Sequence, residues 1–189
     1  MERVAPAQPA DGLPTADGNQ AEAIAGYTRY ATLLDAAEAE TRAMARARLA
    51  RLVDDYRSTG TVGSDNAAWL VGTLAQPGFR DMLAASLSTS DDADNSLGDA
   101  LQGNMAPESW DYLRTAADAL VAALGHIPAP YRAEVLTVVG WTRWLDGKSA
   151  DADRFCELAR QAAPGRTPGG RMWLLLNRRQ LPASARQLH

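Results

Sequence analysis

The sequence is poor in the side chains that build most metal, redox and catalytic sites. It contains one cysteine and two histidines among 189 residues. A single cysteine excludes an internal disulfide, and Cys156 falls on the apolar face of a predicted helix, where a free cysteine is typically a small core residue. His126 and His189 have no partner at a metal-ligand spacing. We therefore expect no metal site and no cofactor.

Catalytic motifs are lacking as well. The sequence holds no GxSxG, P-loop, HExxH or CxxC pattern. The best isolated acids are Asp81, which follows Arg80, and Asp146, which precedes a turn glycine, and both have ordinary structural explanations. We therefore predict that the protein is not an enzyme and assign no catalytic residue.

Long apolar runs and an excess of positive charge are also missing. No stretch approaches the roughly 18–20 apolar residues of a membrane helix, and the N-terminus lacks the charged-then-apolar pattern of a signal peptide. The net charge of −4 argues against binding a polyanion through bulk charge. These absences predict a cytoplasmic protein that does not bind a membrane.

Alternating runs of β-branched residues, which mark strands, are absent between Gln20 and Arg179. The predicted fold class is all-α: an irregular helical bundle of about seven helices, with a long N-terminal helix and a helix hairpin at its centre. In chain order we predict a flexible leader rich in proline and glycine (1–19), a single helical domain (20–180) and a frayed tail (181–189). Within the helical domain we predict the long helix (about 20–57), an acidic loop (88–106) and the central hairpin (131–164).

Apolar bulk is concentrated in the central hairpin. Its first helix, AEVLTVVGWTRWL at 133–145, is apolar on nearly every side, which is typical of a helix in the middle of a bundle. Its second helix begins near Ser149 and ends before Pro164. The predicted core consists of Trp69, Phe79, Leu83, Trp110, Leu113, Leu120, Leu136, Val139, Trp144, Phe155, Cys156, Ala159 and Trp173.

The hairpin resembles a single tetratricopeptide-type unit. Gly140, Gly147, Ala152, Ala159 and Pro164 stand at the spacings where that motif keeps its small residues and its terminal proline. Small residues let two antiparallel helices approach closely. No second copy follows at a period near 34 residues, so the resemblance implies one unit and not a solenoid.

A wider pattern runs through the chain. GFRD at 78–81 is followed by a Trp-led helix, by the proline-flanked hairpin segment at 128–164, by Trp173–Leu175 and by Leu181–Pro182. This order resembles the C-terminal helical half of the actinobacterial domain-of-unknown-function family 4192, over roughly residues 25–185. The resemblance implies a fold and transfers no catalytic residue. The N-terminal α/β half of that family is absent from this sequence.

The leading functional hypothesis is a protein–protein interaction or scaffolding module. A helix over 20–57 would be about 55 Å long, more than the remaining helices can cover, so its first half should project. We expect its apolar side chains to meet a protein partner, either an α/β half in trans or a second copy of the chain. The candidate partner surface is Ile24, Tyr27, Tyr30, Leu33 and Leu34.

Two alternatives remain open. The first is a nucleic-acid-associated protein that uses an arginine-rich helix face, with Arg42, Arg46, Arg48 and Arg51 as the candidate residues. Against it, acidic residues flank this group and no recognised DNA-reading motif is present. The second alternative is an enzyme whose site forms only by tertiary contacts.

Overall fold

The computed structural model describes residues 38–165, 167–169, 171–177 and 181–186. Within these ranges the chain forms α-helices and two short 3₁₀ turns, Leu124–His126 and Ala129–Tyr131, and no strand. The all-α prediction is therefore confirmed for this part of the chain. The α-helices are α2 (Glu38–Thr59), α3 (Ser64–Leu74), α4 (Pro77–Ser86), α5 (Asp94–Leu101), α6 (Trp110–Ala123), α7 (Ala133–Leu145), α8 (Ser149–Ala162), α9 (Arg171–Asn177) and α10 (Ala183–Arg186).

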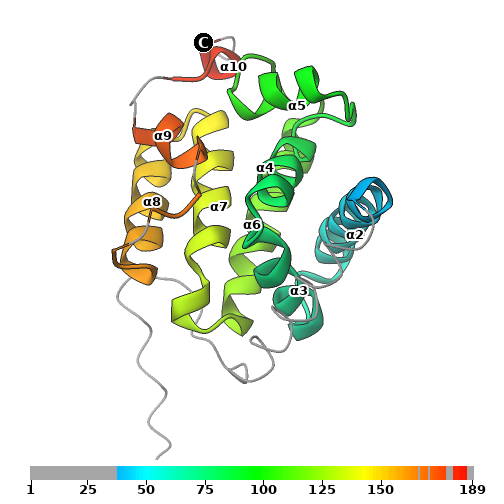
Figure 1. The fold of residues 1–189 in the computed structure, drawn as a ribbon, viewed down its shortest axis with the longest axis vertical. Helices are drawn as coiled ribbons and strands as arrows, with labels where there is room; N and C mark the ends of the chain where they lie inside the picture. The colour runs from blue at the N-terminus through cyan, green and yellow to red at the C-terminus, as the bar shows by residue number, and fades with distance from the viewer. Residues whose placement is uncertain (1–37, 166, 170, 178–180, 187–189) are drawn as a thin grey trace, which may run out of the picture.

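Helix α7 lies at the centre of the bundle, and α2 lies at its edge (Figure 1). Side chains from all around α7 are buried, as the continuous apolar run predicts. Trp141 is fully buried, and its Nε1 donates a hydrogen bond of 2.8 Å to the carbonyl oxygen of Leu101. This bond satisfies the one polar group of a large apolar side chain in the core.

Helices α7 and α8 form the predicted hairpin. A Cβ added at Gly140 would stand 3.4 Å from both the Ala152 carbonyl oxygen and the Cys156 Sγ, an ordinary contact distance that leaves no room for a larger side chain between the two helices. The turn between the helices uses Gly147 at φ +73°, a conformation that glycine adopts without strain. Likeness to a tetratricopeptide unit beyond this hairpin stays a prediction.

The predicted core is largely confirmed. All of its members are buried except Trp110 and Trp173, which are only partly covered. Both tryptophans stand near the surface, where an indole can bury its ring and keep one edge in water.

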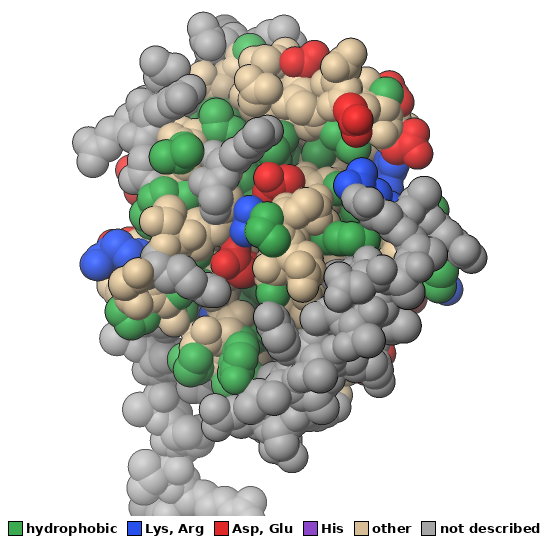
Figure 2. Space-filling view, in the orientation of Figure 1, with side chains coloured by type: hydrophobic (Ala, Val, Ile, Leu, Met, Phe, Trp, Pro, Cys, Tyr) green, Lys and Arg blue, Asp and Glu red, His purple; other side chains and the backbone are tan. Residues whose placement is uncertain are grey.

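Short helices occupy part of two segments that the sequence predicts to be irregular. The predicted acidic loop at 88–106 contains α5, because Ala100 and Leu101 supply buried apolar groups and Asp94 favours the N-terminal turn of a helix. Acidic side chains still gather at the surface over this region (Figure 2). The predicted frayed tail at 181–189 contains α10, whose Ser184 N–H donates a 3.1 Å bond to the Gly103 carbonyl oxygen.

The long N-terminal helix is described only in its second part. Helix α2 ends at Thr59, close to the predicted end at residue 57. It buries Ala45, Leu49, Leu52 and Val53 against the bundle. Residues 20–37 lie outside the described residues.

Candidate functional site

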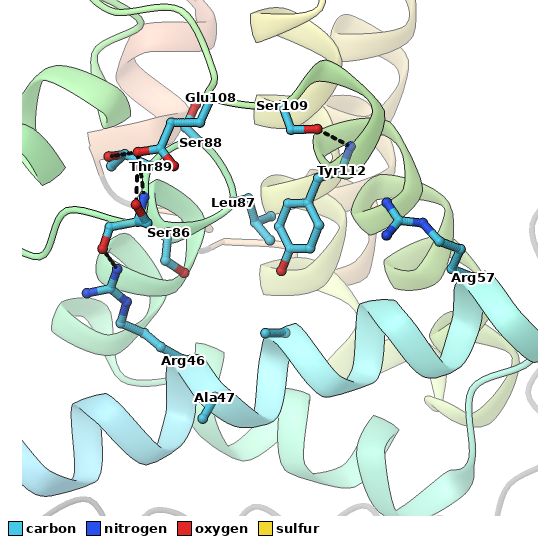
Figure 3. A pocket seen from close by; sticks show the side chains of 12 residues that line it. Arg46, Ala47, Arg57, Ser86, Leu87, Ser88, Thr89, Glu108, Ser109 and Tyr112 are labelled. Carbon is cyan, nitrogen blue, oxygen red and sulfur yellow. Dashed lines mark hydrogen bonds between the residues drawn. The ribbon is translucent and has the colours of Figure 1, made fainter.

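An open groove lies between α2 and the segments that it packs beside (Figure 3). Helix α2 forms one wall. The end of α4 with the segment after it, together with the start of α6, forms the other. We call this space, of about 580 Å³, the α2 groove. It is lined by Arg46, Ala47, Ala50, Arg57, Ser86, Leu87, Ser88, Thr89, Ser90, Glu108, Ser109 and Tyr112.

The groove exists because α2 presents small side chains beside its buried stripe. Leu49 and Val53 anchor the helix in the core. On the neighbouring face, Ala47 and Ala50 leave room that larger side chains would fill. Because residues three and four apart share one side of a helix, these alanines stand on the same wall as Arg46 and Arg57.

The ring of Tyr112 stands between α6 and α2, with its hydroxyl toward α2 (Figure 3). The N-terminus of α6 is held by Ser109, whose Oγ accepts a 3.1 Å bond from the Tyr112 N–H. Burial raises the pKa of the Tyr112 phenol, with a further rise from Asp54 and a smaller opposing effect from Arg57. At neutral pH the hydroxyl is therefore a neutral donor.

Two arginines stand at opposite ends of the groove. Arg46 Nη2 donates a 2.7 Å bond to the Ser90 carbonyl oxygen, and its Nη1 lies 3.6 Å from Asp92. Arg57 Nη2 lies 3.0 Å from Asp111. The side chains of Asp92 and Asp111 are 86% and 85% exposed, and ion pairs in such surroundings contribute little to stability. Arg57 Nη1 also lies 3.6 Å from Asp54. Both arginines are thus already paired within the chain.

Glu108 shapes the wall opposite α2. Its Oε1 accepts bonds from the Ser90 N–H at 2.8 Å, the Thr89 Oγ1 at 2.8 Å and the Ser90 Oγ at 3.2 Å. The backbone bond from Ser90 and the two hydroxyls lower the pKa of Glu108. The Glu108 N–H in turn donates a 2.8 Å bond to the Ser88 carbonyl oxygen. These bonds link the 88–90 segment to Glu108, just before α6.

Ser88 differs from its neighbours in this wall in its hydrogen bonding. The residue is 2% exposed, and its buried Oγ has no hydrogen-bond partner in the described part of the chain. A buried hydroxyl without a partner costs free energy.

The four arginines predicted as a nucleic-acid face do not form one surface. Arg46 lines the α2 groove, whereas Arg48 pairs with Asp65 of α3 and lies 5.0 Å from the centre of the Trp69 ring. Arg51 is exposed, and its Nε donates a 3.4 Å bond to the Ala47 carbonyl oxygen. Arg42 is partly buried on the same helix.

The predicted partner surface cannot be placed. Ile24, Tyr27, Tyr30, Leu33 and Leu34 lie outside the described residues. Sequence reasoning missed the α2 groove, although it noted Arg46, because the opposite wall comes from residues about 40–65 positions later in the chain. A polar segment next to small helix residues is too common a signal to reveal such a pairing.

The isolated acids considered from the sequence are engaged in ion pairs. Asp81 Oδ1 accepts a 3.0 Å bond from Arg80 Nε. Asp146 Oδ1 accepts bonds from Arg114 Nε at 2.9 Å and Nη2 at 2.7 Å, while Lys148 Nζ lies 2.7 Å from its Oδ2. Burial alone would raise the pKa of Asp146, but its bonds to Arg114 and Lys148 and their charges outweigh burial and lower it.

Cys156 is buried on α8. Burial, with a smaller contribution from Asp153, raises the pKa of its thiol to about 12. The thiol is therefore protonated at neutral pH, whereas a nucleophilic cysteine needs its thiolate.

Metal-ion clusters and membrane-spanning helices are both absent from the described residues. No group of three or more His, Cys, Asp or Glu side chains in these ranges is arranged to hold a metal ion. No helix in the same ranges combines the length and apolarity needed to cross a membrane.

Comparison with known proteins identifies a family and little else. No curated protein and no solved structure matches the chain. The family described as "Domain of unknown function (DUF4192)" matches residues 1–176. This match extends further toward the N-terminus than the predicted limits of 25–185, so it includes the segment interpreted as a leader. On this evidence, the chain belongs to the DUF4192 family of domains of unknown function.

Proposed function

We propose that this protein is a protein–protein interaction module, without catalytic activity of its own, that holds a segment of its partner in the α2 groove. The observation that carries the proposal is the composition of the groove. It combines an aromatic ring, an arginine at each end and a buried hydroxyl without a described partner.

These residue types favour protein recognition. Tyrosine and arginine are enriched among the residues that dominate the binding energy of protein interfaces. A tyrosine also offers a large contact area at a low cost in conformational entropy. In the α2 groove, Tyr112, Ala47 and Ala50 supply apolar surface, and polar groups surround them. An apolar centre with a polar rim is the usual anatomy of an interface.

The size of the groove limits what it can hold. A volume of about 580 Å³ accommodates a few side chains of a peptide segment and is too small for a folded domain. The walls are held by the Glu108 bonds and by the burial of Leu49 and Val53, so binding needs little rearrangement of the protein. Pre-organisation of this kind lowers the entropic cost of binding.

The experiment is a selection of randomly displayed peptides on the full-length protein, followed by affinity measurements with a groove-filling variant. Ala50→Trp places an indole in the groove. We expect it to weaken the selected peptides by about tenfold or more, since this corresponds to about 1.4 kcal/mol of lost contact. Ala150→Trp is the matched control, because Ala150 is an exposed residue of α8.

Wild-type affinity in the Ala150→Trp variant together with loss in Ala50→Trp supports the proposal. Selected peptides that bind Ala50→Trp as tightly as the wild type would show that the α2 groove is not the binding surface.

A further inference from the structure

A chain of hydrogen bonds joins the two walls of the α2 groove at its Arg46 end. The bonds run from Glu108, just before α6, through the backbone of Ser90 to Arg46 on α2. Resting on the proposed function, we infer that Glu108 is a positioning residue of the groove: by holding Ser90, it determines where the Arg46 side chain lies.

Ser90 is bonded at both of its backbone polar groups. Its N–H donates a 2.8 Å bond to Glu108 Oε1, and its carbonyl oxygen accepts a 2.7 Å bond from Arg46 Nη2. The residue is exposed, so water can satisfy both groups when either side chain is removed. The place of Ser90 therefore depends on these two side chains, and Glu108 reaches Arg46 through it.

The two residues before Ser90 are held in another way. Ser88 and Thr89 are each 2% exposed. Their N–H groups both donate to the Ala85 carbonyl oxygen, at 2.8 and 3.2 Å. Burial and the end of α4 thus hold the start of this segment. Ser90 is the point where the segment leaves the core, so the bond from Glu108 matters most there.

Glu108 is well suited to hold Ser90. Its Oε1 also accepts bonds from the Thr89 Oγ1 at 2.8 Å and from the Ser90 Oγ at 3.2 Å. Together with the bond from the Ser90 N–H, which has the largest effect, these bonds lower the pKa of Glu108. The carboxyl is therefore ionised at neutral pH. Hydrogen bonds to an ionised acceptor are stronger than those between neutral groups.

The opposite end of the groove has its own ion pairs. Figure 3 shows Glu108, Thr89 and Arg46 on one side of the Tyr112 ring and Arg57 on the other. Arg57 lies 3.0 Å from Asp111 of α6. Asp111 therefore supplies a matched control, because it is an exposed acid of the same wall that pairs with the other arginine.

The first test uses the free full-length protein. Solvent exchange of the Arg46 guanidinium protons is measured by NMR on protein with isotope-labelled arginine, and Arg46→Gln assigns the signal. We expect Glu108→Ala to speed this exchange by about fivefold or more, the factor that corresponds to the loss of one ordinary hydrogen bond. Glu108→Gln keeps an oxygen acceptor for the Ser90 N–H and should restore slow exchange. Asp111→Asn should leave Arg46 unchanged.

Unchanged exchange of the Arg46 protons in Glu108→Ala would overturn the inference. Equal acceleration at the buried Arg80 would also overturn it, because the substitution would then loosen the whole protein.

The second test measures the affinity of a peptide selected by display on the wild type. We expect Glu108→Ala and Arg46→Gln each to weaken this peptide by about fivefold, since both remove pre-organisation of the same wall. The double variant should lose no more than either single variant, because both substitutions break one chain of bonds. Losses that multiply to about 25-fold would show that Glu108 acts on the peptide independently of Arg46, and would overturn the positioning role.

The two proposals fail in different ways. If Ala50→Trp leaves peptide binding unchanged, the proposed function fails, and the exchange of the Arg46 protons still decides whether Glu108 positions that side chain. If Ala50→Trp abolishes binding while Glu108→Ala has no effect on it, the proposed function stands and this inference alone is overturned.

Discussion

Helices α7 and α2 show how differently two helices of one bundle can be used. In α7, 11 of the 13 residues are buried, including residues on every side. In α2, the buried side chains form a single stripe, and Met44 is 65% exposed. A helix that is buried on all sides serves the fold alone, because any substitution in it disturbs the packing of the core. A helix anchored by one stripe leaves its other faces available for binding.

The largest loss of stability should come from placing a charge in α7. Val139 is fully buried, so Val139→Asp brings a carboxylate into an apolar environment without a partner. We expect a loss of about 5 kcal/mol or more, enough to unfold a typical domain. Circular dichroism and chemical denaturation measure this loss. A variant that melts like the wild type would show that α7 is not the centre of the bundle.

A smaller loss of stability should come from a larger side chain at the point where α7 and α8 approach most closely. Gly140→Leu inserts a branched side chain where Ala152, Phe155 and Cys156 already lie within 3.5 Å of a single Cβ. Overpacking of this kind costs about 1–3 kcal/mol. Gly140→Ala is the matched control, because one methyl group meets ordinary contact distances and improves helix propensity. If both variants are equally stable, the hairpin is not tightly packed at this point.

The Asp146 cluster should make stability depend on pH. The pKa of Asp146 is lowered in the folded protein, so its contribution is present above its ordinary value of 3.8 and is lost as the pH falls toward the lower folded value. Asp146→Asn should therefore destabilise the protein by about 1–3 kcal/mol at neutral pH, a modest range because Arg114 and Lys148 are half exposed.

Denaturation curves recorded from neutral pH to about pH 2 measure this difference, which should shrink in acid as the wild-type carboxylate is protonated. Glu157→Gln is the control, because its ion pair with Arg160 is exposed. A constant difference between Asp146→Asn and the wild type at all pH values would contradict the ion-pair explanation.

The smallest change in stability should come from a substitution on the outer face of α2. Met44→Gln replaces an exposed side chain with another good helix former, and we expect a change within about 0.5 kcal/mol. Thermal melting measures it. A marked loss of stability would mean that this face is covered in solution, and that α2 differs less from α7 than its exposure indicates.

Local patterns in the sequence were enough to predict much of the core. The apolar run of α7 and the spacing of Phe155, Cys156 and Ala159 predict buried positions, because burial follows the helical period. Helix α5 was missed because its acidic residues resemble those of a solvated loop, while its short apolar stripe becomes evident only against the rest of the bundle.

The α2 groove could not be predicted, because it depends on residues that meet only in the folded chain. Arg46 and the Ser90 carbonyl oxygen that it contacts are 44 positions apart. Tyr112 reaches α2 from a helix that begins at Trp110. The sequence pattern of neither segment predicts its contact with the other, so this contact is a property of the tertiary structure.

Hydrogen exchange of the full-length protein, with and without a peptide selected by display, tests the central claim most directly. The account predicts that the peptide slows exchange in α2 around residues 46–57, in the segment 86–90 and at the start of α6, and leaves α7 and α8 unchanged. Slowed exchange confined to other helices, or none at all with a bound peptide, would show that the α2 groove is not where this protein meets its partner.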